Sequence, residues 1–411
     1  MGETDRHEPS PNAELEPAAA VRPQRVLRLD ALRGVAILLV LGHHIGAYHE
    51  PWGLPRVAMT AFRVWQTLGW MGVDLFFVLS GFLVAGLLFA EFNKHGRIRL
   101  GRFFIRRGFK IYPAFYVMLV ATAVALHYGG LWDGGRALHE ALFIQNYAAG
   151  LWPHTWSLAV EEHFYLLAGL SLAILARKPS SFAGVPAAVL VLLALLPVAR
   201  LASYREPAAL LVPAATHLRV DGLLAGVLLA YFHHFHPQRL AAWVTRRTAA
   251  LAATTLVAFA VAVVYAWRLD AYGLRALGLT ALSLGFAALL LLALRPVAPA
   301  TGLERRGTEL LAWVGFYSYS IYLWHVPAAE WFFGFLAGRL GTGSSFLVGF
   351  AFYMVGTVAA GVGMAKLVEG PCLALRDRLY PSLSGSAVTA PDTTKRRCRP
   401  EPRGRTARPT S

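Results

Sequence analysis

Long apolar segments separated by short polar connections dominate this chain. A helix that crosses a bilayer needs about 20 largely apolar residues. By that measure the sequence predicts ten spans, at residues 31–49, 69–90, 111–128, 156–176, 183–203, 215–233, 249–267, 274–294, 310–332 and 346–368. The fourth and sixth carry charged residues. We therefore expect an all-α fold, a polytopic integral membrane bundle of about ten transmembrane helices.

Basic residues alternate between the connections. They gather before the first span, in the even-numbered connections and after the last span, whereas Arg136 stands alone in the third connection and Arg339 in the ninth. Because cytoplasmic connections of membrane proteins carry an excess of Lys and Arg, this alternation predicts that both termini are cytoplasmic.

The composition supports the same class. The chain has 411 residues, of which 56% are hydrophobic and 15% charged, while about a quarter of the residues of a typical soluble domain are charged. The net charge of +16 would suit a nucleic-acid partner, but the basic residues lie in short connections between apolar segments, so we expect no nucleic acid. Cys372 and Cys398 are too few for a disulfide framework or a metal cluster, and no metal site is predicted.

The two ends differ from the rest. Residues 1–25 are polar and lack the apolar region of a cleaved signal peptide. Residues 382–411 are rich in Pro, Thr and Arg. We expect both segments to be disordered and residues 26–375 to form the membrane domain.

Ionisable residues inside spans indicate where the chemistry lies, because they are costly in a bilayer and usually mark a polar path or reaction centre. Arg33 and His44 are eleven positions apart on the first span, which places them on one face about 16 Å apart along the axis. The predicted orientation sorts the polar residues into two layers. The outer layer contains His44, Glu161, Arg219, Asp221 and His325, with Asp74 and Tyr322 close by, and the inner layer contains Arg33, Arg107 and Lys110.

Each layer suits one part of a transfer reaction. A histidine beside a carboxylate suits proton abstraction or acyl transfer, and clustered cations suit a phosphate-bearing donor. Structural interpretations stay open beside these. Glu161 could pair with Arg219 only to neutralise buried charge, Arg33 could anchor its helix at the membrane surface, and Asp74 could serve helix packing.

Six motifs occur in order along the chain, and together they carry a family resemblance. They are Leu29-Asp30 with Arg33 and His44, Gly72-Val73-Asp74-Leu75-Phe76-Phe77-Val78-Leu79-Ser80-Gly81-Phe82, Arg106-Arg107 followed by Lys110-Ile111-Tyr112-Pro113, Trp156-Ser157-Leu158-Ala159-Val160-Glu161, Arg219-Val220-Asp221-Gly222-Leu223, and Ser318-Tyr319-Ser320-Ile321-Tyr322-Leu323-Trp324-His325. Over about residues 27–375 the chain resembles the membrane-bound acyltransferase family 3. Lys110 stands where the family pattern has a second arginine, so it keeps the charge but loses the bidentate fork.

The resemblance implies an O-acyltransferase of the inner (plasma) membrane. The donor would be a cytoplasmic acyl-CoA, acetyl-CoA by default, used as a co-substrate with no tightly bound cofactor. The acceptor would be a hydroxyl of a glycan, lipid or macrolide, and membrane lipid would surround the protein. Arg33, Arg107 and Lys110 would bind the donor, and Asp74, Arg219, Tyr322 and His325 would support the site or line the acceptor path.

The expected mechanism centres on His44, oriented by Glu161 or Asp221. His44 either removes the acceptor proton or takes the acyl group itself. Two rivals fit the buried charges. One is a multi-span transporter or flippase, which favours symmetry-related broken helices, and the other is a glycan polymerase or lipid-linked glycosyltransferase, which we expect to have large outer loops.

Overall fold

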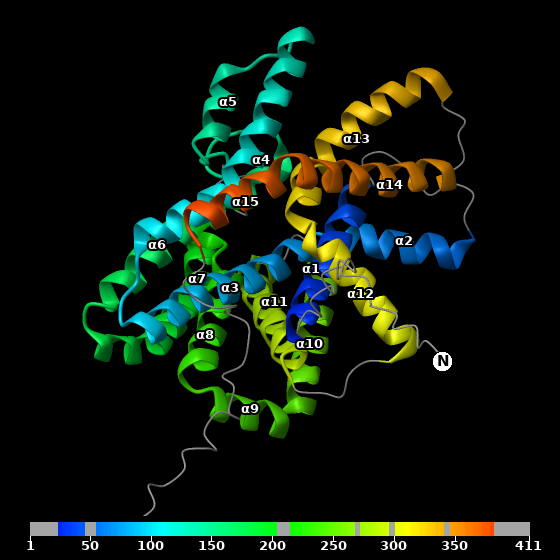
Figure 1. Cartoon of the computed structure of the whole chain (residues 1–411). Helices are drawn as coiled ribbons and strands as arrows, with labels where there is room; N and C mark the ends of the chain where they lie inside the picture. The colour runs from blue at the N-terminus through cyan, green and yellow to red at the C-terminus, as the bar shows by residue number, and fades with distance from the viewer. Residues whose placement is uncertain are drawn as a thin grey trace, which may run out of the picture.

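The computed structural model describes residues 24–45, 55–203, 214–267, 272–295, 301–340 and 346–381, and these ranges contain helices and no strands (Figure 1). The N-terminal half comprises α1 (Gln24–Ile45), α2 (Arg56–Leu68), α3 (Met71–His95), α4 (Leu100–Tyr128), α5 (Gly134–Ala141), the 3₁₀ turn η1 (Pro153–Thr155), α6 (Trp156–Leu175), the 3₁₀ turn η2 (Pro179–Gly184) and α7 (Val185–Ser203). The C-terminal half comprises the 3₁₀ turn η4 (Thr216–Leu218), α8 (Asp221–Phe235), α9 (Pro237–Arg246), α10 (Thr248–Trp267), α11 (Tyr272–Ala293), α12 (Gly302–Phe316), α13 (Ser318–Leu340), α14 (Phe346–Met364), the π-helix η5 (Ala365–Glu369) and α15 (Gly370–Leu379).

The all-α prediction is confirmed for these residues. Six helical stretches within them are long and apolar enough to cross a membrane, and a seventh arises if the bent pair α9 and α10 counts as one span. The six are Met71–His95, Leu100–Tyr128, Pro153–Leu175, Phe182–Ser203, Ala276–Ala293 and Val348–Leu379. The predicted number of ten spans is therefore not confirmed.

Three predicted spans correspond to none of these seven stretches. The span at 310–332 is wrong as a single helix, because α12 ends at Phe316 and α13 begins at Ser318. The span at 215–233 starts as the turn η4, and α8 itself has 15 residues, about 22 Å at 1.5 Å per residue. The span at 31–49 corresponds to α1, which carries Arg28, Asp30 and Arg33. The predicted disorder of residues 1–25 and 382–411 falls almost entirely on residues outside those described.

Small residues let the central helices approach at backbone distance. A Cβ built on Gly81 in α3 would lie 2.1 Å from the Leu223 carbonyl oxygen in α8, and one on Gly226 would lie 2.4 Å from the Val78 carbonyl oxygen. A Cβ on Gly34 in α1 would lie 2.0 Å from the Leu311 carbonyl oxygen in α12. Such close approach is the usual way helices associate in membranes, and it places α3 at the centre of the bundle between α1 and α8 (Figure 1).

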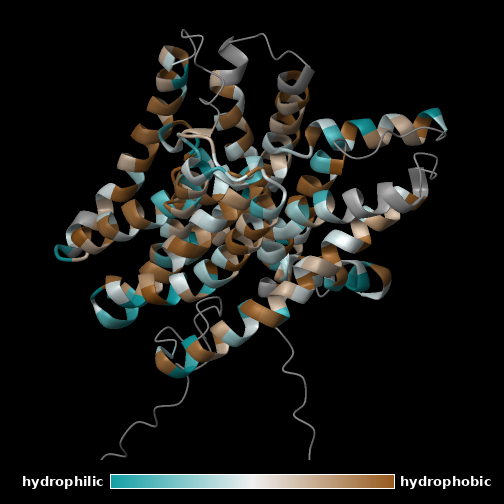
Figure 2. Cartoon of the chain, turned by 90° about the horizontal axis from the view of Figure 1, so that it is seen from above, coloured by the Kyte–Doolittle hydropathy of each residue, from teal (hydrophilic) through white to brown (hydrophobic). Residues whose placement is uncertain are grey.

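The outer helices present apolar side chains to their surroundings. In Figure 2 hydrophobic residues occur along much of the length of the helices. Leu167 on α6, Val198 on α7 and Leu256 on α10 each expose 60% or more of their area. Soluble domains do not display apolar surface on this scale, so the exterior matches a lipid environment. The protein is a membrane protein.

Candidate functional site

A cavity of about 330 Å³ lies between α1, α3, α4, α6, α8 and α13. Its apolar wall comes mainly from α3, for example Phe76, Leu83 and Leu87. Its polar lining comprises Arg33, Ser80, Arg107, Lys110, Ser157, Glu161, Glu162, His233, His234, Ser318, Tyr319 and Tyr322. All three cations that the sequence predicted as one group therefore line the same space.

Each of these cations has a different partner. Arg107 stacks over the Tyr165 ring, with its guanidinium carbon 4.1 Å from the ring centroid. Lys110 Nζ lies 3.7 Å from a Glu369 carboxylate oxygen, and Arg33 lies 3.5 Å from the Asp30 carboxylate. The neighbouring Arg106 turns away from the cavity to Asp377 of α15. Arg107 therefore lines the cavity and Arg106 contacts a neighbouring helix, because consecutive residues of a helix point about 100° apart.

Glu161 belongs with these cations. The Tyr165 hydroxyl donates to the Glu161 carboxylate and is itself 2.6 Å from the Ser80 hydroxyl, while the Tyr165 ring lies under Arg107. The predicted layering, which separated Glu161 from Arg107, is therefore not what the structure shows.

Glu162 also lines the cavity, on the side of Tyr112. The Tyr112 hydroxyl donates to a Glu162 oxygen at 3.0 Å. The 100° rotation between consecutive helical residues favoured Glu161 alone, yet the cavity is wide enough to reach both carboxylates.

The second polar feature is a histidine cluster, by which we mean His44, His154 and His325. These residues lie at the end of α1, in η1 and in α13. The ring centroids of His44 and His325 are 4.8 Å apart, those of His154 and His325 are 4.9 Å apart, and those of His44 and His154 are 6.4 Å apart. Among the residues that the structure describes, no group of His, Cys, Asp or Glu is arranged to hold a metal ion.

Hydrogen bonds connect the cavity to the histidine cluster. The Ser157 and Tyr322 hydroxyls, both at the cavity, are 2.7 Å apart. The Tyr322 hydroxyl donates to the backbone carbonyl of His154 at 2.6 Å. The hydroxyl of Tyr322 therefore links the cavity to the backbone of His154, although the three histidines are not among the residues that line the cavity.

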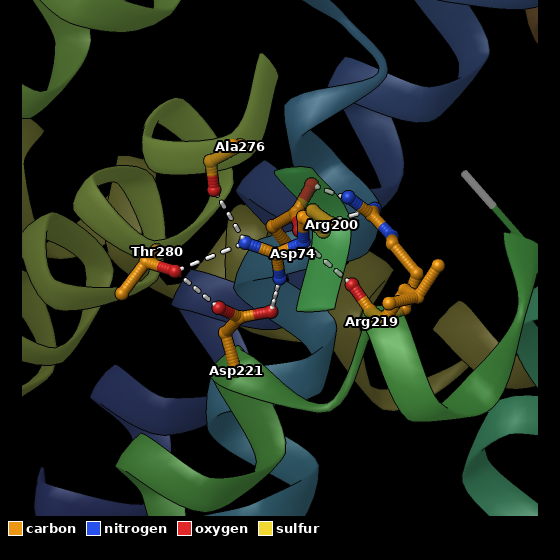
Figure 3. Close-up of polar contacts among 7 residues, drawn as sticks. Asp74, Arg200, Arg219, Asp221, Ala276 and Thr280 are labelled. Carbon is orange, nitrogen blue, oxygen red and sulfur yellow. Dashed lines mark hydrogen bonds and ion pairs between the residues drawn. The ribbon is translucent and has the colours of Figure 1, made fainter. Parts of the chain in front are cut away.

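Two buried ion pairs form a separate cluster at the start of α8. Arg219 lies 3.1 Å from Asp74 of α3, and Arg200 of α7 is paired with Asp221. Figure 3 shows Arg200 also donating to the Ala276 carbonyl at 2.8 Å and to the Thr280 hydroxyl at 3.0 Å, while Thr280 donates to Asp221 at 2.5 Å. These contacts join α3, α7, α8 and α11.

This arrangement corrects two sequence predictions. Arg219 pairs with Asp74, so the possible pairing of Glu161 with Arg219 is wrong. Asp221 uses both carboxylate oxygens on Arg200 and Thr280, so it does not orient His44. The sequence did not indicate that Arg200 or Thr280 belongs to this cluster. A single arginine near the end of an apolar helix usually indicates only the orientation of that helix in the membrane.

Several residues of the site were not predicted. His154 precedes the predicted fourth span by two positions, and Tyr165 follows Glu161 by one helical turn. Glu162 follows Glu161 directly and points about 100° away from it on a helix, and Glu369 follows the last predicted span by one position. The position of His154 beside the motif that starts at Trp156 is the one signal that could have identified it.

Comparison with known proteins agrees with the motifs. The family model described as "Acyltransferase domain" matches residues 26–366. The chain belongs to this acyltransferase family. Its membership confirms the resemblance on which the sequence interpretation rests.

Curated relatives carry related names. The peptidoglycan O-acetyltransferase OatA of Listeria monocytogenes is 27% identical over 327 residues, which is 73% of this chain and 48% of that protein. A Bacillus subtilis protein named "Putative peptidoglycan O-acetyltransferase YrhL" is 27% identical over 323 residues, with the same coverage of 73% and 48%. A Staphylococcus aureus protein named "Putative O-acetyltransferase" is 30% identical over 155 residues, or 34% of this chain and 23% of that protein.

The chain spans less than half the length of these relatives, at 48% and 23%. No solved structure matches it.

Proposed function

We propose that this chain is a membrane O-acyltransferase that takes an acyl group from a cytoplasmic acyl-CoA and transfers it to a hydroxyl of a glycan. The observation that carries the proposal is the cavity itself. It is lined by Arg33, Arg107 and Lys110 and also by Tyr322, whose hydroxyl donates to the backbone carbonyl of His154 in the histidine cluster. The family membership and the names of the relatives support the reaction class and the glycan acceptor.

The cations would hold the phosphates of the donor. Arg33 and Arg107 can each offer a planar fork of donors to a phosphate, and Lys110 can offer a point charge. The apolar wall along α3 would take the pantetheine arm and the acyl chain, because apolar linings bury the non-polar parts of a ligand. By the alternation of basic connections, the cations lie toward the cytoplasm and the histidine cluster toward the outer surface.

His44 would act as the general base. Its Nδ1 bonds the Val40 carbonyl oxygen at 3.0 Å, and since a carbonyl only accepts, Nδ1 carries the proton and Nε2 keeps a lone pair. Nε2 takes the proton of the acceptor hydroxyl. The hydroxyl oxygen then forms a bond to the thioester carbon and the C–S bond breaks. CoA leaves as the thiolate, while the proton stays on Nε2 of His44.

A covalent route differs in one intermediate. Nε2 of His44 would first take the acyl group and then pass it to the acceptor. Incubation with radiolabelled acetyl-CoA in the absence of acceptor separates the two routes, because only the covalent route leaves label on the protein.

The decisive experiment uses the full chain in membranes with radiolabelled acetyl-CoA, followed by separation of glycan, lipid and small-molecule fractions. We expect label in the glycan fraction, and none when His44 is replaced by alanine. Label in no fraction, together with uptake of an unmodified solute, would overturn the proposal in favour of a transporter.

A further inference from the structure

Each imidazole of the histidine cluster bonds a backbone carbonyl through one ring nitrogen. His44 Nδ1 bonds the Val40 oxygen at 3.0 Å, His154 Nε2 bonds the Leu323 oxygen at 3.3 Å, and His325 Nδ1 bonds the Tyr322 oxygen at 2.6 Å. Because a carbonyl oxygen accepts hydrogen bonds and never donates them, the bonded nitrogen carries the hydrogen in each ring. The carbonyls therefore fix all three tautomers when the rings are neutral.

The opposite nitrogens consequently hold lone pairs. For His154 this is Nδ1 and for His325 it is Nε2, and both atoms are buried with no hydrogen-bond partner among the residues that the structure describes. The two side chains are 2% and 0% exposed. Two lone pairs cannot satisfy each other, and an unpartnered buried acceptor is unfavourable. The cluster is thus complete only when something supplies hydrogen-bond donors.

We propose that His154 and His325 bind the acceptor, accepting hydrogen bonds from hydroxyl groups that neighbour the one His44 deprotonates. His154 Nδ1 and His325 Nε2 each take one hydroxyl hydrogen, so the acceptor must carry at least two further hydroxyl groups near the reacting one. That requirement selects a polyhydroxylated ring or chain over an isolated alcohol. The inference rests on the proposed acyl transfer, in which His44 is the base.

A purely structural role makes a different prediction. If these histidines serve only to anchor backbone, the bonded nitrogen matters and the lone-pair nitrogen does not. Asparagine places its amide where Nδ1 lies, and glutamine places its amide close to the position of Nε2. The two substitutions at each site therefore separate the two nitrogens.

The test measures transfer from acetyl-CoA to the soluble probe N,N′,N″-triacetylchitotriose with the full chain in detergent. At position 154 the lone pair is on Nδ1, so we expect His154→Asn to keep the KM for the saccharide within about threefold and His154→Gln to raise it about tenfold. At position 325 the lone pair is on Nε2, so the order reverses, with His325→Gln tolerated and His325→Asn raising that KM about tenfold. The KM for acetyl-CoA should not change in any of the four variants.

His127, exposed at the end of α4, supplies a matched control. Neither His127→Asn nor His127→Gln should alter the KM for the saccharide. The reverse order, glutamine tolerated at 154 and asparagine at 325, overturns the proposal and leaves backbone anchoring as the role. Equal effects of both amides at each site overturn it as well.

Nitrogen NMR of the ¹⁵N-histidine-labelled protein gives a readout that needs no transfer. We expect the Nε2–H tautomer for His154 and the Nδ1–H tautomer for His325, with the lone-pair nitrogens moving upfield when the saccharide is added. If the unsubstituted chain transfers no acetyl group but these shifts occur, the acyl-transfer proposal fails and the binding site stands. If the tautomers are reversed, or the saccharide causes no shift, the binding site fails whatever the activity.

Discussion

Gly315 of α12 lies against the backbone of Asp30 of α1 so closely that a Cβ on the glycine would be 1.7 Å from the Asp30 carbonyl oxygen. This contact holds the face of α1 that bears Asp30 and Gly34 against α12, while Arg33 on the same helix lines the cavity. Because the obstacle is backbone, it cannot move aside as the end of a flexible side chain would. The position of Arg33, for which we propose donor binding, thus depends on the absence of a side chain on another helix.

We predict that Gly315→Ala forces α1 and α12 apart and destabilises the protein by about 1–3 kcal/mol, the usual effect of overpacking. Thermal unfolding in detergent measures the loss, and acetyl transfer should fall with it as Arg33 is displaced. Gly307→Ala on the same helix is the control, since a Cβ there meets no atom within 4 Å. Equal unfolding temperatures for the two variants would contradict the prediction.

The cavity cations provide a second prediction. Arg107→Ala removes the proposed hydrogen bond from a charged group to a donor phosphate, and such a bond contributes about 1.5–3 kcal/mol. The KM for acetyl-CoA should therefore rise about tenfold to a hundredfold, while the KM for the acceptor stays constant. Steady-state kinetics with each substrate varied in turn measures both. Arg106→Ala is the matched control, because Arg106 pairs with the exposed Asp377 and such pairs contribute about 0–1 kcal/mol. A similar rise for both variants would show that net charge alone matters.

Asp221 should prove structural. Asp221→Ala leaves Arg200, which has no exposed area, buried without its carboxylate, a loss of about 3–5 kcal/mol. We expect a clear drop in unfolding temperature and in the yield of folded protein, with the rate per folded molecule little changed. The double variant Arg200→Met with Asp221→Leu removes both charges and should recover most of the stability. A normal unfolding temperature with lost turnover would instead make Asp221 part of the reaction.

His44→Ala should lower the transfer rate by about 10²–10⁴, the usual contribution of a general base, and leave the unfolding temperature close to that of the parent chain. His43→Ala tests the neighbouring ring, which is exposed and bonds the Gln66 carbonyl oxygen at 2.9 Å, and it should retain activity. Rate measurement with both substrates saturating checks the pair. If His44→Ala keeps the parent rate, His44 is not the base.

The structure agrees with the sequence motifs on the grouping of the cations. The motif residues Arg33, Arg107 and Lys110 were expected to act together and do line one cavity. The expectation that Glu161 lies in a different layer from Arg107 failed, because position along a span does not decide which side chains of different helices meet. Tyr165 contacts both residues. The span at 310–332 failed as a single helix because nothing in the apolar pattern marked the break at Tyr317.

The sequence alone determined the class of the protein, its helical character and its family, because apolar length, charge alternation and ordered motifs are properties of the chain taken one segment at a time. The tertiary structure alone decided the partners: that Asp74 meets Arg219, that Asp221 meets Arg200, and that His154 joins His44 and His325. These pairs join residues far apart in the chain, and their meeting depends on how helices rotate and on where glycines let them touch. A helix turns by about 100° per residue, so a small error in its start or its rotation gives every side chain on it different neighbours.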